Sequence, residues 1–130
     1  MTNQKDPLAS LFTSDARATD RQKLAELLKP FVIIDESSKE FSFSDAFSVL
    51  KNNTQKIEIV LCAAKAKSLF FNEVDGLPPG DIIALGIMPE GSVKTSLKKL
   101  FDDHKVKKDK EGRYFIPAYR VPELVKQFNE

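Results

Sequence analysis

Cysteine, histidine and tryptophan are almost absent from this sequence, which has one cysteine, one histidine and no tryptophan in 130 residues. The single cysteine, Cys62, excludes an internal disulfide, and the single histidine, His104, leaves no zinc ligand set. The sequence also lacks a glycine-rich phosphate loop, a metal-ligand spacing and a Ser–His–Asp set. We therefore expect a protein that is not an enzyme and that uses no cofactor and no metal.

Long apolar runs are missing as well. The longest nearly uncharged run, Ile59–Ala64, is far shorter than the roughly 18 to 20 residues that a membrane span needs. Residues 1–10 lack the basic start and the apolar stretch of a signal peptide. With 42% hydrophobic residues, 30% charged residues and no low-complexity tract, the composition predicts one compact cytoplasmic domain that does not enter a membrane.

Positive charge gathers in one segment of a chain whose formal net charge is only +1. Residues 1–91 hold ten positive and thirteen negative side chains, whereas residues 92–113 hold eight positive and four negative ones, and the remainder is neutral. A local positive field of this kind attracts phosphate groups. A lysine-rich helix face is, however, most often a solvated surface, so charge alone leaves both interpretations open.

Two segments precede the longest predicted helix. Residues 1–19 carry few large apolar side chains, and we expect a mobile segment whose "LASLF" stretch either docks on a neighbour or frays as a helical turn. Residues 20–53 are expected to form an extension made of one helix and one β-hairpin. Asp20 can cap the helix "RQKLAELLKPF", and the apolar run Phe31–Ile34 is followed by turn residues and by the alternating pattern "FSF".

The longest predicted helix runs from about Thr54 to Phe71, and its apolar residues form two stripes around it. A helix that is apolar over so much of its circumference belongs at the centre of the fold or in a dimer interface. Cys62 lies inside this pattern, so we expect a small buried hydrophobic residue rather than a nucleophile.

Two shorter helices and a second hairpin follow. The stretch "GDIIALG" predicts a helix that ends at Gly86, because glycine accepts the left-handed conformation of a helix stop. The stretch "EGSVKTSLKKLFDDHKV" predicts another helix, in which four apolar residues face inward: Val93, Leu97, Leu100 and Phe101. Strand candidates around "VKK" and "RYFIP" flank a tip at residues 109–112 and predict the hairpin.

In this order, helix, helix, turn, helix and hairpin, residues 54–117 resemble a winged helix-turn-helix domain. The segment "PEGSVKTSLKKLFDDHKVKKDKEGRYFIP" is similar to the recognition helix and wing of archaeal and bacterial members. The resemblance implies a mostly α fold with small β-hairpins, to which this chain adds the N-terminal helix and hairpin and a C-terminal helix at residues 118–130. That last helix either closes the core of its own chain or, exchanged with a partner, makes a homodimer.

The resemblance further implies a regulator of transcription that binds double-stranded DNA, with its third helix in the major groove and its wing on the phosphate backbone. The expected contact residues on the helix are Ser92, Lys94, Thr95, Lys98 and Lys99. Those on the wing are Lys107, Lys108, Lys110 and Arg113. Lysine suits phosphate better than it reads bases, so sequence specificity is expected to be modest. The alternative is a winged helix module that docks other proteins without direct DNA binding.

Overall fold

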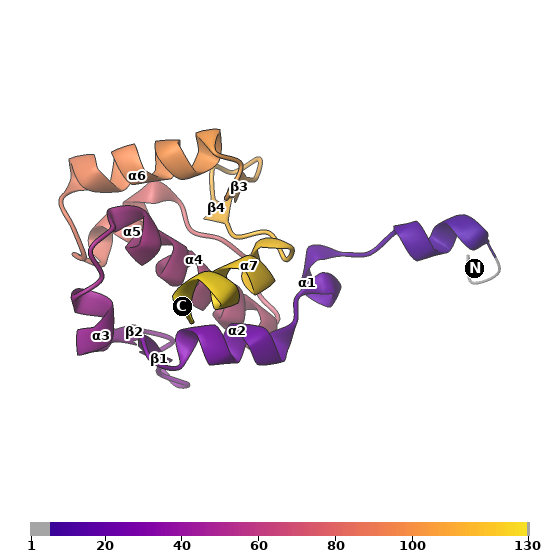
Figure 1. The fold of residues 1–130 in the computed structure, drawn as a ribbon, viewed down its shortest axis with the longest axis horizontal. Coiled ribbons are helices and arrows are strands. Elements are labelled where there is room, and N and C mark those ends of the chain that lie inside the picture. Colours follow the sequence, from indigo (N-terminus) through magenta and orange to yellow (C-terminus); the bar gives the residue numbers. More distant parts are fainter. Residues whose placement is uncertain (1–5, 130) are drawn as a thin grey trace.

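The structure, a computed structural model, describes residues 6–129 and is mostly helical, with two small antiparallel sheets of two strands each (Figure 1). Its helical elements are η1 (Pro7–Leu11), α1 (Asp15–Ala18), α2 (Arg21–Leu28), α3 (Asp45–Ser48), α4 (Asn53–Phe71), α5 (Pro79–Ala84), α6 (Glu90–Asp102) and α7 (Arg120–Phe128). Its strands are β1 (Val32–Ile34), β2 (Phe41–Phe43), β3 (Lys107–Lys108) and β4 (Tyr114–Phe115). Within this described range, no helix is both long and apolar enough to cross a membrane.

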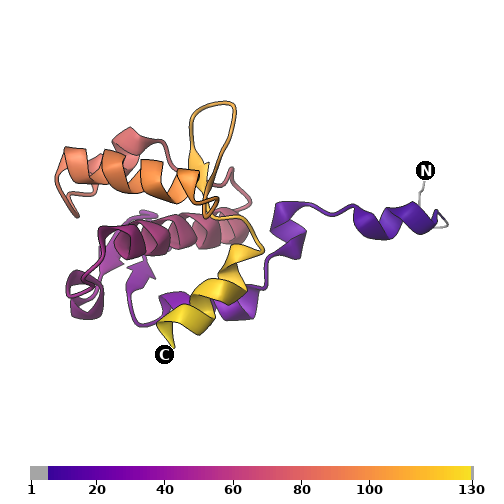
Figure 2. The ribbon, with the colours of Figure 1, turned by 45° about the horizontal axis from the view of Figure 1, so that its top comes forward.

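Helix α4 forms the centre of the fold, as its two apolar stripes predict. Ile57 and the run Ile59–Ala63 have no exposed surface. Helix α6 covers one side of α4, and α2 and α7 cover the other (Figure 2). Cys62 is fully buried, and burial raises the pKa of its thiol, so it serves as a small core residue.

The N-terminal extension contains the predicted helix and hairpin. Asp20 caps α2 by accepting the backbone N–H of Lys23 at 3.1 Å, and the helix buries three leucines in the core. In the first sheet Val32 lies opposite Phe43, whose ring stacks on Phe47 of α3 with centroids 4.3 Å apart. The extension therefore packs on α4 through apolar side chains of both its helix and its hairpin.

The second hairpin gains one more paired residue from the chain that leads into α5. Leu77 and Tyr114 exchange both backbone hydrogen bonds, at 2.9 and 2.8 Å. This bridge ties the segment between α4 and α5 to β4. After α5, the chain turns at Gly86, whose φ of +71° is a conformation that favours glycine.

The C-terminal helix α7 packs on its own chain. Val121 and Leu124 have no exposed surface, and the ring of Phe128 meets Phe31 edge-on with centroids 5.5 Å apart. Of the two roles predicted for this helix, closing the core is the one that this packing supports.

The predicted burial of Phe101 is wrong, because its side chain is 45% exposed. Helix α6 ends one residue later, and His104 takes a left-handed φ of 61° that lets the N–H of Lys105 bond to the carbonyl of Leu100 at 2.9 Å. Phe101 therefore lies in the last turn, at the edge of the core rather than within it.

The first residues of the described chain lead away from the body of the molecule (Figures 1 and 2). In and just after η1, the side chains of Leu8, Leu11 and Phe12 are between 59% and 74% exposed. Of the predicted mobile segment, residues 1–5 lie outside the described residues, and the mobility of the remainder stays a prediction. Its last part is attached to the body through Asp15.

Candidate nucleic-acid interface

The outward face of α6 is set by the side chains that the helix buries. Val93, Leu97 and Leu100 are at most 2% exposed and belong to the core cluster. Because side chains three and four residues apart share a helix face, the intervening positions are left in solvent. Four predicted contact residues lie on this exposed face: Lys94, Thr95, Lys98 and Lys99. Ser92 is half-buried near the start of the helix.

Each of the three lysines of α6 is paired with a carboxylate one turn away. The pairs and their N–O distances are Lys94–Glu90 at 2.8 Å, Lys98–Asp102 at 2.9 Å and Lys99–Asp103 at 3.2 Å. The hydrogen bond from Lys94 holds the pKa of Glu90 below its ordinary value. Exposed pairs of this kind contribute only about 0 to 1 kcal/mol each. A phosphate group can therefore take the place of a carboxylate at little cost, although the pairs reduce the positive potential of the face.

The β3–β4 hairpin, which is the predicted wing, is held together by Asp109 at its turn. Its carboxylate accepts the backbone N–H groups of Glu111 and Arg113 and the Nε–H of Arg113, at 2.8 to 2.9 Å. These hydrogen bonds, led by the one from the Arg113 backbone, hold the pKa of Asp109 below its ordinary value. The guanidinium of Arg113 also lies 3.3 Å from Glu111. Arg113, which was predicted to contact phosphate, is thus bound inside the hairpin.

The three wing lysines remain exposed. Lys107 and Lys108 are adjacent on β3, and their ammonium groups lie over different rings, 5.6 Å from the centroid of Tyr119 and 5.4 Å from that of Tyr114. Lys110 lies in the exposed part of the turn. These side chains are available to a phosphate backbone that approaches the wing.

Helix α6 and the wing adjoin where the helix ends. The ring of Phe101 in the last turn of α6 meets Tyr114 of β4 edge-on, with centroids 6.2 Å apart. Helix α6 and the β3–β4 hairpin, the two elements that carry the predicted contact residues, therefore meet at one junction (Figure 1).

Two buried ionic clusters brace this scaffold, and neither was predicted from the sequence. The first joins Glu58 of α4 to Arg120 of α7, whose side chains are 3% and 8% exposed. Both the Nε and the Nη2 of Arg120 donate to one oxygen of Glu58, at 3.1 and 2.9 Å. Burial raises the pKa of Glu58, and the nearby guanidinium opposes that rise.

The second cluster surrounds Lys65, which is 1% exposed. Its ammonium group donates to Asp15 and, at 2.6 Å, to Asp75. The other oxygen of Asp15 accepts the backbone N–H of Ala118 at 2.7 Å. Burial raises the pKa of Asp75, while the Lys65 ammonium lowers it. Asp15 thus connects the N-terminal segment to α4 and to the chain that leads into α7.

A sequence signal for both clusters exists. Glu58 and Lys65 are seven residues apart in an otherwise apolar part of α4, and residues at that spacing lie on the same side of a helix. Two charges on one side of a central helix need partners elsewhere in the chain, because an unpaired buried charge is costly.

No family model matches this chain, and no curated protein or solved structure matches it either.

Proposed function

We propose that this chain is a DNA-binding winged helix protein that regulates transcription. What supports the proposal is the order of its elements: α4, the bridging residue Leu77, α5, α6 and the β3–β4 hairpin. In a winged helix of this order α6 enters the major groove, and the wing lies along the adjacent backbone. The observation that carries the proposal is the exposed lysine face of α6, which the buried side of that helix keeps turned outward.

In this proposal the side chains of α6 and of the wing have different tasks. Lys94, Lys98 and Lys99 exchange their carboxylate partners for phosphates at the edges of the groove, while Thr95 lies close enough to the groove to meet a base edge or a phosphate. The wing lysines position the protein on the backbone. Arg113 keeps the shape of the wing instead of meeting DNA, because Asp109 and Glu111 already occupy its guanidinium.

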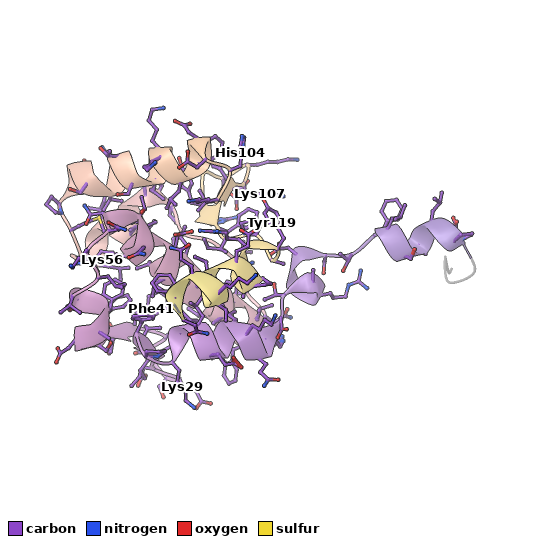
Figure 3. The ribbon with its side chains drawn as sticks, in the orientation of Figure 1. Lys29, Phe41, Lys56, His104, Lys107 and Tyr119 are labelled. Carbon is purple, nitrogen blue, oxygen red and sulfur yellow. The ribbon has the colours of Figure 1, made fainter. Side chains whose placement is uncertain are left out.

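The test is the binding of a blunt DNA duplex over a series of salt concentrations. Each phosphate contact contributes about 0.9 to the slope of log affinity against log salt. The double variant Lys94→Ala/Lys98→Ala should therefore lose about 2 from that slope. A matched control with the same change of charge is Lys29→Ala/Lys126→Ala, whose lysines are exposed just after α2 and on α7, away from α6 (Figure 3 labels Lys29). No binding at low salt, or equal slopes for the two double variants, would refute the proposal.

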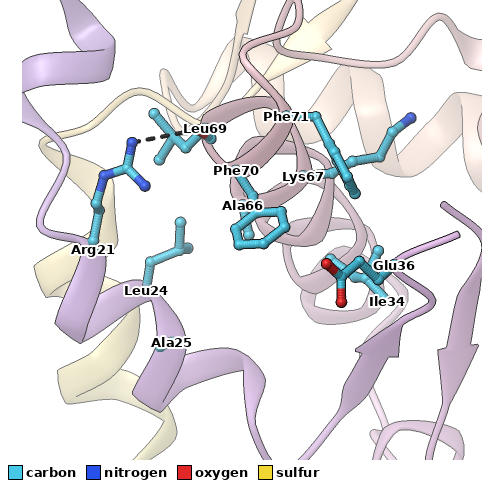
Figure 4. Close-up of a pocket in the computed structure, with 10 residues that line it drawn as sticks. All are labelled: Arg21, Leu24, Ala25, Ile34, Glu36, Ala66, Lys67, Leu69, Phe70 and Phe71. Atoms are coloured by element: carbon cyan, nitrogen blue, oxygen red, sulfur yellow. Dashed lines mark hydrogen bonds between the residues drawn. The ribbon is translucent and has the colours of Figure 1, made fainter.

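A protein-docking role has a separate observation in its favour. An apolar hollow lies between α2, β1 and the end of α4, lined by Leu24, Ile34, Leu69 and Phe70 among others (Figure 4). The side chain of Phe70 is 68% exposed and adds apolar surface to the hollow, and contiguous exposed apolar surface is typical of docking sites. If the folded protein binds no duplex at low salt, docking through this hollow becomes the better hypothesis.

A further inference from the structure

A second hollow lies at the junction of α6 and the wing. It has a volume of about 450 Å³ and opens between the end of α6, β3 and the turn that leads into α7. Phe101, His104, Lys107, Lys108 and Tyr119 contribute to its walls. Figure 3 shows His104, Lys107 and Tyr119 gathered at this corner of the molecule.

Two aromatic rings of this hollow face solvent. Phe101 is 45% exposed and Tyr119 is 56% exposed. Each ring is contacted by the protein on one side. Phe101 meets Tyr114 edge-on, and the hydroxyl of Tyr119 lies 3.5 Å from the carbonyl of His104. The remaining surface of both rings is open to a ligand.

The charges around the rings indicate which kind of ligand this hollow favours. Lys107 and Lys108 bring two ammonium groups to the lining of the hollow, against the one carboxylate of Asp102. The Lys107 ammonium lies 5.6 Å from the centroid of Tyr119, and that of Lys108 lies over Tyr114, the ring that Phe101 meets edge-on. This surplus of ammonium groups disfavours a cationic ligand, which exposed rings would otherwise attract. It favours a planar, apolar group that is attached to a negative charge.

A nucleotide with an unpaired base has these two properties. Exposed aromatic rings beside basic side chains are typical of surfaces that bind single strands, where bases stack on the rings and phosphates meet the cations. A base inside a duplex cannot offer its face, because its neighbours in the stack cover it. We infer that this hollow receives an unpaired base from a single strand that leaves the duplex held by α6 and the wing. The inference rests on the proposed DNA binding and adds to it a preference for duplexes with a single-stranded tail.

The experiment compares a blunt duplex with the same duplex carrying a short unpaired tail, by fluorescence anisotropy. The protein should bind the tailed duplex about tenfold more tightly, the gain expected from stacking one base. The variant Phe101→Leu/Tyr119→Leu should lose that preference and keep the affinity for the blunt duplex, because it changes no charge and keeps an apolar side chain against Tyr114 where α6 meets the hairpin. Tyr119→Phe, which keeps the ring, should keep the preference. A matched control is Phe70→Ala, which removes an exposed ring from α4 and should change neither affinity.

A second readout reports stacking directly. With 2-aminopurine in the tail, binding should quench its fluorescence in the wild type and in Tyr119→Phe but not in Phe101→Leu/Tyr119→Leu. Equal affinity of the wild type for blunt and tailed duplexes would overturn the inference and leave the proposed function intact. A tail preference that survives the loss of both rings would also overturn it, because lysines alone would then explain the preference. Binding to neither duplex would overturn the inference together with the proposed function.

Discussion

Removal of the Arg120 guanidinium should destabilise the fold far more than the loss of a surface charge. The variant Arg120→Met keeps the length and the apolar stem of the side chain but leaves the carboxylate of Glu58, which is 3% exposed, without its partner. Arg120 also bonds to Glu123 and Gln127, but the side chain of Glu123 is 59% exposed and returns to water at little cost. The loss of unfolding free energy therefore comes mainly from the buried carboxylate of Glu58, which is left without a partner. Breaking a buried pair in this way costs about 3 to 5 kcal/mol.

The double variant Glu58→Met/Arg120→Met distinguishes the cost of an unpaired buried charge from the cost of lost packing. Because it removes both ions and fills the space with apolar atoms, it should recover most of the stability that Arg120→Met loses. The surface control on the same helix, Lys126→Met, should stay within about 0.5 kcal/mol of the wild type. Urea unfolding followed by circular dichroism measures all three variants. If the double variant is as unstable as Arg120→Met, or if the single variant loses less than about 1 kcal/mol, the argument from a buried charge is refuted.

The same pair predicts a pH dependence. Burial raises the pKa of Glu58 in the folded protein above its ordinary value of 4.5, so the folded state holds this proton more tightly than the unfolded state. The stability contributed by Glu58 should therefore fall as pH rises from that ordinary value through the raised one. In Arg120→Met the rise is larger because the opposing guanidinium is gone. The variant should consequently lose less stability in mildly acidic buffer than near neutral pH, and an equal loss at both would contradict this assignment.

Three further predictions concern the other charged groups. Lys65→Met should lower the free energy of unfolding in urea by about 2 to 3 kcal/mol, less than the full cost of breaking a buried ion pair, because the carboxylate partners of Lys65 are partly exposed. Lys67→Met on the same helix should lower it by less than about 1 kcal/mol, and equal losses for the two variants would contradict the buried cluster. Asp109→Ala should lower the protection factors of the wing amides, that is, their protection relative to unfolded amides at the same pH. Acid should lower them likewise in the wild type once pH falls through the lowered pKa of Asp109, and unchanged protection would show that the turn does not depend on this carboxylate. Asp102→Asn/Asp103→Asn should tighten binding to a blunt duplex by roughly threefold to tenfold at low salt, because Lys98 and Lys99 lose the carboxylates that compete with phosphate. Weaker binding would count against phosphate contact by that face of α6.

Elements with strong local signals could be predicted from the sequence. The cap at Asp20, the central position of α4 and the buried side of α6 all follow from spacing and capping within a few residues. The fold is mostly helical with two small hairpins, as expected. These features depend on neighbours in the sequence, and this is why a single sequence is enough to find them.

Features that depend on distant partners could not be predicted. The partner of Glu58 lies 62 residues further along the chain, and the Asp15 carboxylate meets an amide 103 residues away. The exposure of Phe101 is linked to a helix stop at His104, and a positive φ is uncommon at any residue other than glycine, so the sequence does not mark this stop clearly. In the candidate interface, the positions of the α6 lysines could be predicted, but the capture of Arg113 within its own hairpin could not, because charge counting treats every arginine as free.

The attachment of Asp15 bears on how the chain can be shortened or extended. Its carboxylate fastens the beginning of the folded chain to Lys65 and to the amide of Ala118, just ahead of the last helix. Truncated variants that keep Asp15 keep this link between the N-terminal segment, α4 and the chain that leads into α7. A deletion that reaches Asp15 would remove one of the two counter-ions of the buried Lys65 ammonium together with the hydrogen bond to the Ala118 amide, so shortening from the N-terminal side should cost stability once it passes this acid.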